Sequence, residues 1–381
     1  MGCATEMAPG HAGGRSGPIS QSEAQAGSEE VLHLPAASAS LRQDQTMPFL
    51  SYEARNFSTP LAGPTAGSLS LPLARLVWGA VTVGMTPFSM GGAPRPLLEL
   101  GWRAALTAAS LTEDPASGRW ARTAGYRRLD PSEKRAVSYF LGMTQAKITC
   151  EHLLRASHLI HLDAYLAVVG QPSRASRPDL IGLSLPSLDC TIAVEAKGRT
   201  GGRTGKVTAA AKKQAQSLPA VVSASSAVRV ASVASFDPRG CWEAYLEDPP
   251  DSAKVMASLT AGSLLATYYR PLVAAQAEVG ESQVSEENSI TLAELPGIDL
   301  VLGIPTVIVT IIRPLPLTGP VPDEQLRAVE ADLLEIVRSR HLTSRADAAE
   351  LDIAQTQGQP VPSRSYTGLD GIYVGLGSSW A

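Results

Sequence analysis

Residues that build disulfide scaffolds and zinc sites are scarce in this sequence. Its 381 residues include four cysteines, with no C-x-x-C pair, and six histidines at no zinc-finger spacing from them. Structural zinc is usually held by closely spaced cysteine pairs, and disulfide-stabilised folds use more cysteines. We therefore expect neither kind of site, and a reducing, cytoplasmic environment.

Long hydrophobic runs are also absent. The longest, 301–312, is interrupted by Gly303 and Pro305 and ends at Arg313. A membrane-spanning helix needs about 20 apolar residues, so this run predicts a buried strand and no membrane association is expected. The first 45 residues lack the basic start and apolar core of a signal peptide, and they predict a disordered tail.

Aromatic residues make up only 5% of the chain, and the five tryptophans are scattered. No base-stacking surface is therefore evident. Serine and cysteine hydrolases also find no support, because no Gly-x-Ser-x-Gly elbow occurs and Cys150, near His152, has no third orienting residue.

One strong helix start is present at 130–133, the sequence Asp-Pro-Ser-Glu. Asp130 can cap the free N–H groups, proline fits the first helical position, and Glu133 completes a capping box. We predict a helix from there to about Arg155. Further helices are predicted at 206–218, 253–277 and 322–340, and strands at 76–83, 158–166, 179–185, 191–197, 228–236, 242–246, around 307 and at 370–376.

This alternation of helices and strands is typical of an α/β sheet layered with helices. The chain is long enough for two domains or one decorated domain. We predict the following segments: a disordered tail at 1–47, an N-terminal accessory segment with short strands at 48–128, a core at 129–277, an acidic linker at 278–290 and a C-terminal strand–helix–strand accessory segment at 291–381.

Two carboxylates and a lysine carry the clearest chemical signal. A hairpin that turns near position 187 sets Asp179 opposite Glu195, and opposed residues share a sheet face. The strand period of two adds Lys197 to the face of Glu195. Neighbouring carboxylates repel, so their proximity indicates a divalent cation or the Lys197 ammonium between them. The alternatives are a turn residue or an ion-pair partner of Arg177 for Asp179, and a solvated strand face for Glu195 and Lys197.

Such a cluster suits phosphodiester hydrolysis. Asp179, Glu195 and the Ala196 carbonyl are hard oxygen ligands for Mg²⁺ or Mn²⁺. The ion would activate a bound water and neutralise the scissile phosphate, while Lys197 would orient the water and stabilise the transition state.

At these residues the sequence resembles the PD-(D/E)xK nuclease superfamily. Pro178 and Asp179 match the PD, and Glu195 and Lys197 match the E-x-K, within a resemblance that covers about 130–246. The resemblance implies an α/β fold with a restriction-endonuclease-like core of a helix, a three-stranded meander, a second helix and further strands. It also implies metal ligation by the two acids and a catalytic role for the lysine.

The resemblance extends to other positions of the chain. Many members carry a metal-binding carboxylate on the first helix, for which Glu133 is the candidate; a purely capping role is the alternative. Exonuclease-type members add Gln-x-x-x-Tyr, of which Gln214 is present while Leu218 stands at the tyrosine position. The stretch 132–147 is similar to that of high-GC bacterial proteins with this signature. A homodimer is compatible with the resemblance.

A basic strip follows the proposed site. No Asp or Glu occurs from 197 to 229, although the whole chain has a net charge of -4. Glycines before the predicted helix at 206–218 would expose backbone N–H groups that favour a phosphate. We expect contacts to a nucleic-acid backbone, DNA in the first place, from Arg199, Arg203, Lys206, Lys212, Lys213 and Gln214.

Two other functions compete with a nuclease. A nuclease-like module without catalysis could bind nucleic acid or a partner protein. A nucleotide-binding P-loop is disfavoured, because 201–206 has one residue too few between its glycines and Val207 occupies the Ser/Thr position.

Overall fold

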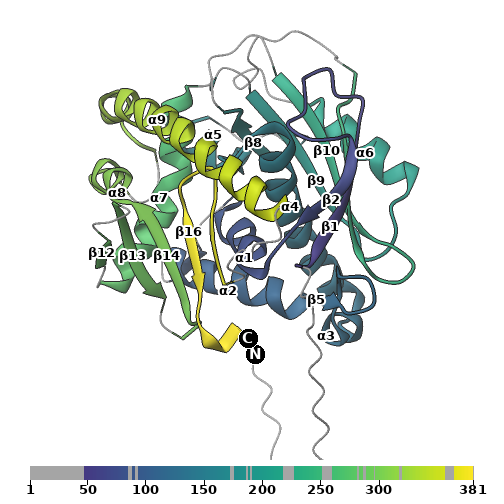
Figure 1. Cartoon of the computed structure of the whole chain (residues 1–381). Helices are drawn as coiled ribbons and strands as arrows, with labels where there is room; N and C mark the ends of the chain where they lie inside the picture. The colour runs from purple at the N-terminus through teal and green to yellow at the C-terminus, as the bar shows by residue number, and fades with distance from the viewer. Residues whose placement is uncertain are drawn as a thin grey trace, which may run out of the picture. The chain divides into compact units, whose positions relative to one another are not determined.

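The computed structural model is built around a mixed sheet that contains nine strands within the described residues (Figure 1). The structure describes residues 47–84, 88–90, 93–171, 176–185, 188, 191–217, 227–250, 260–280, 283–285, 289–295, 297–316, 320–356 and 364–380. The predicted disordered tail lies outside them, apart from its last residue. All described residues belong to one unit, 46–381.

The large sheet has the strand order β5-β6-β1-β11-β10-β9-β8-β7, with β2 paired to β1. Its strands are β1 (Phe49–Arg55), β2 (Ala66–Ser70), β5 (Leu111–Asp114), β6 (Arg119–Arg122), β7 (Ile160–His161), β8 (Leu180–Leu183), β9 (Thr191–Gly198), β10 (Ala227–Phe236) and β11 (Trp242–Glu247). β7, β8 and β9 form an antiparallel meander, whereas β10 is parallel to β9. The segment predicted as an N-terminal accessory thus contributes β1, β2, β5 and β6 to the same sheet as the predicted core.

A second, antiparallel sheet has the order β12-β13-β14-β16-β15. Its strands are β12 (Gln283–Ser285), β13 (Ile290–Leu295), β14 (Leu300–Pro305), β15 (Ser365–Thr367) and β16 (Tyr373–Leu376), and a separate hairpin joins β3 (Phe88–Met90) to β4 (Ala93–Arg95).

Helices fill the space between the two sheets and cover the outer face of the large one (Figure 1). They are α1 (Leu73–Thr82), α2 (Pro96–Ser110), α3 (Ala124–Arg128), α4 (Pro131–Leu154), α5 (Leu162–Val168), α6 (Gly205–Ala215), α7 (Ala261–Val279), α8 (Thr306–Ile312) and α9 (Asp323–Thr356), with a 3-10 turn at Ser378–Trp380. α4 packs on β9 and β10 from one side, and α6 packs on the same strands from the other. The predicted α/β class is confirmed.

The predicted start of α4 is confirmed in detail. The Asp130 side chain accepts from the backbone N–H groups of Ser132 and Glu133, and the Glu133 carboxylate accepts from the Asp130 N–H. These bonds satisfy N–H groups that lack partners within the helix. The helix ends at Leu154, with Arg155 in the left-handed conformation at its C-cap.

Three predicted strands are wrong, wholly or in part. Residues 76–83 lie mostly in α1, and residues 76–82 are all buried; a short apolar run cannot be assigned to a strand or to a buried helix by its period alone. Only two residues of 158–166 are strand, before α5 begins. The run 301–312 is divided at Pro305 into β14 and α8. The predicted linker 278–290 includes the end of α7 and β12.

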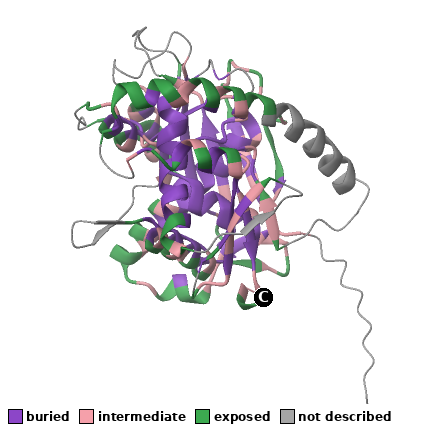
Figure 2. Cartoon of the chain, turned by 90° about the vertical axis from the view of Figure 1, so that its left-hand side faces the viewer, coloured by how far each residue is buried: buried purple, intermediate pink, exposed green. Residues whose placement is uncertain are grey.

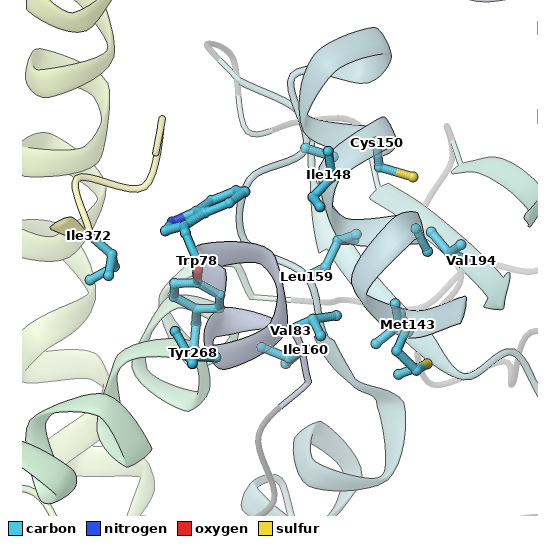
Figure 3. Packing of buried hydrophobic residues seen from close by; sticks show 14 of the residues in the cluster. Trp78, Val83, Met143, Ile148, Cys150, Leu159, Ile160, Val194, Tyr268 and Ile372 are labelled. Atoms are coloured by element: carbon cyan, nitrogen blue, oxygen red, sulfur yellow. The ribbon is translucent and has the colours of Figure 1, made fainter. Parts of the chain in front are cut away.

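Buried residues form a continuous core through the helical layer (Figure 2). Figure 3 shows this packing from Val194 on β9, across Met143 and Ile148 on α4, to Trp78 on α1 and Ile372 near the C-terminus. The C-terminal strands therefore belong to the same core as the large sheet.

A polar network is buried inside this core. Lys147 on α4 is fully buried, and its ammonium donates to the Ser157 carbonyl oxygen, to the Tyr268 hydroxyl at 2.8 Å and to the Asp370 carboxylate at 3.3 Å. Trp78 donates to the same carboxylate from α1. These bonds connect α1, α4 and α7 to the C-terminal segment.

Candidate functional site

The meander brings the two predicted carboxylates together. Leu180 on β8 pairs with Val194 on β9, so the next position in the antiparallel register sets Asp179 opposite Glu195. The predicted register is thereby confirmed. Arg177 forms an ion pair with Asp163, and its charge also acts to lower the pKa of Asp179.

Asp179, Glu195 and Lys197 lie close together. One Asp179 oxygen accepts from the Ala196 backbone N–H at 3.0 Å, which takes the place of a strand hydrogen bond where β8 begins. The Lys197 ammonium forms an ion pair with Glu195, and the negative charge of Asp179 acts on the Glu195 carboxyl group. Glu195 is fully buried, whereas the Lys197 side chain is 30% exposed. The lysine thus connects a buried carboxyl group to solvent.

Burial makes both carboxyl groups weaker acids than usual. Desolvation, followed by the negative charge of Asp179, raises the pKa of Glu195 to about 7, although Lys197 opposes this shift. Desolvation also raises the pKa of Asp179, against the Ala196 N–H and the Lys197 charge. The described residues supply no further hydrogen-bond donor to the Glu195 oxygens. One lysine therefore does not fully compensate the two acids.

This donor set fits a divalent cation in part. The N–H and C=O of one residue point to the same side of an antiparallel strand. Because the Ala196 N–H meets Asp179, its carbonyl oxygen is directed to the side of the carboxylates. Two carboxylates and one carbonyl are hard ligands of the kind that Mg²⁺ or Mn²⁺ accepts, with water completing the shell. Within the described ranges, no group of three or more His, Cys, Asp or Glu side chains forms a metal site.

Glu133 does not join the pair. Its carboxylate completes the capping box at the exposed start of α4. No contact between Glu133 and Asp179 or Glu195 is found among the described side chains. The observed role of Glu133 is the capping alternative.

The predicted basic strip is partly neutralised within the protein. Arg203 lies 3.6 Å from the Glu53 carboxylate and 3.7 Å above the Tyr245 ring, and Lys212 lies 2.9 Å from Glu247. The other predicted contacts are Arg199 and Gln214, which are half-buried, and Lys206 and Lys213, which are exposed on α6. The N-terminus of α6 is capped by the Thr204 side chain.

Close packing of α4 against β9 brings Tyr139 to the candidate site, a residue that the sequence did not indicate. A Cβ at Gly198 would overlap the Ser138 carbonyl oxygen and lie 3.0 Å from the Tyr139 nitrogen. Tyr139 is 37% exposed, and burial and the charges of Asp179 and Glu195 together raise its pKa to about 12. Placing Tyr139 at the site requires both the helical period of α4 and the contact of α4 with Gly198. That contact cannot be predicted from the sequence.

Comparisons with family models, with curated proteins and with solved structures find no match to this chain. No helix of the described part is both long and apolar enough to cross a bilayer.

Proposed function

We propose that this chain is a metal-dependent nuclease that hydrolyses DNA phosphodiester bonds at a PD-(D/E)xK-type site. The observation that carries the proposal is the clustering of Asp179, Glu195 and Lys197 at the point where β8 begins and β9 ends. The order of α4, the β7–β8–β9 meander, α6 and the parallel β10 gives further support, because the family resemblance implies this core. A role in restriction, repair or defence fits such an activity.

The residues of the site would divide the work. Asp179 is held in place by the Ala196 N–H, so its second oxygen can bind a ligand. Glu195, with a pKa near 7, releases its proton close to neutral pH. A cation held by both acids and the Ala196 carbonyl would polarise the phosphate and activate water. Lys197 is partly exposed, so its ammonium can reach a phosphate oxygen and stabilise charge there.

A cleavage assay tests this function. Plasmid, linear duplex and single-stranded DNA are incubated with the protein in Mg²⁺ or Mn²⁺, beside Lys197→Ala, Glu195→Gln and the control Lys134→Ala on α4. We expect the first two substitutions to lower the rate by about 100-fold or more, as for loss of a transition-state contact. A wild type that cleaves none of the substrates, or a Lys197→Ala variant that cleaves as fast, would refute the proposal.

The second candidate is a nuclease-like module that binds DNA or a partner protein without catalysis. The neutralisation of Arg203 and Lys212 by Glu53 and Glu247 favours the form of this candidate that binds a partner protein, because fewer charges remain for a phosphate backbone. DNA binding without cleavage in the same assay would support this candidate.

A further inference from the structure

An aromatic surface is formed where α2 meets α4. Apart from Val307 on α8, the exposed large hydrophobic side chains of the described residues are Leu98 and Trp102 on α2 and Tyr139 on α4. The ring of Phe140 contacts Trp102 and Tyr139 edge to face, with centroid distances of 4.4 and 5.1 Å. We call Leu98, Trp102, Tyr139 and Phe140 the aromatic patch.

The aromatic patch borders the candidate site. The Tyr139 backbone packs against Gly198, the residue that follows Lys197, as the close approach of α4 to β9 requires. The charges of both Asp179 and Glu195 also act to raise the pKa of the Tyr139 hydroxyl. A ligand bound at the carboxylates therefore has an exposed ring within reach.

The charges around the site limit what can bind there. Asp179 and Glu195 repel phosphate unless a cation is present, and Arg203 and Lys212 already have acidic partners in the protein. A nucleic acid would gain affinity from contacts that do not depend on charge, and stacking on exposed aromatic rings is the usual source of such affinity.

We propose that the aromatic patch stacks the unpaired bases of single-stranded DNA whose backbone passes Asp179, Glu195 and Lys197. This inference rests on the proposed nuclease function and makes single-stranded or unwound DNA the substrate class. Bases inside a duplex are already stacked on each other, so they cannot lie on the rings without unpairing. Stacking accepts every base, so little sequence preference is expected.

Binding measurements test the inference. A labelled 12-nucleotide oligo(dT) and a labelled 12-bp duplex are titrated with protein by fluorescence anisotropy, with Ca²⁺ in place of Mg²⁺ to prevent cleavage. We expect Trp102→Ala and Tyr139→Ala each to weaken oligo(dT) binding by roughly 5- to 150-fold, the range for one lost stacking contact. Tyr139→Phe keeps the ring and should bind like the wild type. Val307→Ala, which removes an exposed apolar side chain elsewhere, is the matched control.

The salt dependence separates stacking from charge. The slope of log affinity against log salt should stay unchanged in the patch variants, because they lose no phosphate contact. Thermal melting identifies variants that do not fold, and Trp102→Phe, which keeps a smaller ring, replaces any that fail. We expect Trp102→Phe to bind oligo(dT) more tightly than Trp102→Ala does.

Several results would overturn the inference. Oligo(dT) binding that is unchanged in Trp102→Ala and Tyr139→Ala would do so, as would equal weakening of duplex binding. A change of molecular mass by light scattering in these variants would instead make the patch an interface between copies of the chain. If the wild type cleaves DNA but oligo(dT) binding does not depend on the aromatic patch, only this inference is overturned. If binding depends on the patch but no DNA is cleaved, the nuclease function is overturned and the stacking proposal stands.

Discussion

At the scale of one residue, Glu195 shows how a candidate catalytic group can lower the stability of the fold. Its side chain is fully buried beside a second acid, and among the described residues Lys197 and Asp179 are the partners that face its oxygens. Burying a carboxylate with incomplete compensation is costly, and the raised pKa expresses that cost. Such strain is common where a site is arranged for a ligand.

The pH dependence of stability follows from this pKa. The pKa of Glu195 is about 7 in the folded protein, whereas an ordinary glutamate has a pKa of 4.5. Between these values the unfolded chain has lost a proton that the folded protein retains, so stability falls as pH rises from 4.5 to 7 and then levels off. Glu195→Gln removes this titration.

Urea unfolding of the wild type and Glu195→Gln at pH 5 and pH 8 measures the effect. We expect the Glu195→Gln variant to gain stability relative to the wild type at pH 8, by on the order of 3 kcal/mol more than at pH 5. Mg²⁺ should restore part of the wild-type stability at pH 8 and should have less effect on Glu195→Gln. Parallel pH profiles for the two proteins would contradict the burial of an uncompensated acid.

At the scale of elements, α4 packs against β9, the strand that carries Glu195 and Lys197. Gly142 and Gly198 let the helix approach β9 closely; a Cβ on Gly142 would lie 2.7 Å from the Gly198 nitrogen. The exposed first turn of the helix extends beyond this contact and holds the capping box. The start of α4 therefore stabilises the helix itself, whereas the middle of α4 packs against the strand that carries the site.

Substitutions in the capping box test the role of Glu133. Asp130→Ala should lower the free energy of unfolding by about 1 kcal/mol, as loss of an N-cap does. Glu133→Gln should preserve both stability and cleavage, because glutamine also completes a capping box. Urea unfolding and the DNA cleavage assay measure both. A loss of cleavage in Glu133→Gln as large as that in Glu195→Gln would make Glu133 a metal ligand after all.

At the scale of the whole described unit, the buried network connects distant parts of the chain. Lys147 joins Asp370, Tyr268 and the Ser157 carbonyl oxygen, and its ammonium lies 4.5 Å from the centroid of the Trp78 ring. Removing one partner of a buried ion pair leaves an uncompensated charge in the core. The C-terminal segment is thereby fastened to the helices that support the large sheet.

A double-mutant cycle measures this connection. Lys147→Met and Asp370→Asn should each lower the free energy of unfolding, Lys147→Met by about 3 to 5 kcal/mol. The double variant should lose less than the sum, with a coupling of about 0.5 to 3 kcal/mol in urea unfolding. Additive losses would show that Lys147 and Asp370 do not stabilise each other.

Parts of the fold and site with local causes were predictable. Asp130 and its following proline and glutamate define the start of α4, and turn spacing alone sets Asp179 opposite Glu195. The stretch 76–83 was not, because a short apolar run cannot be assigned to a strand or to a buried helix such as α1 by its period alone. The position of Lys147 was not predictable either. A lysine in a sequence usually indicates a surface position, whereas Lys147 lies in the core.

The sequence by itself determined the strand register and the helix cap, since both depend on residues close along the chain. Only the tertiary structure decided that Trp102 joins Tyr139 and Phe140 in the aromatic patch, and that Arg203 and Lys212 are neutralised by Glu53 and Glu247. These pairs come from segments far apart in the sequence. Their contacts depend on how helices pack on the sheet, and a linear pattern does not record that packing.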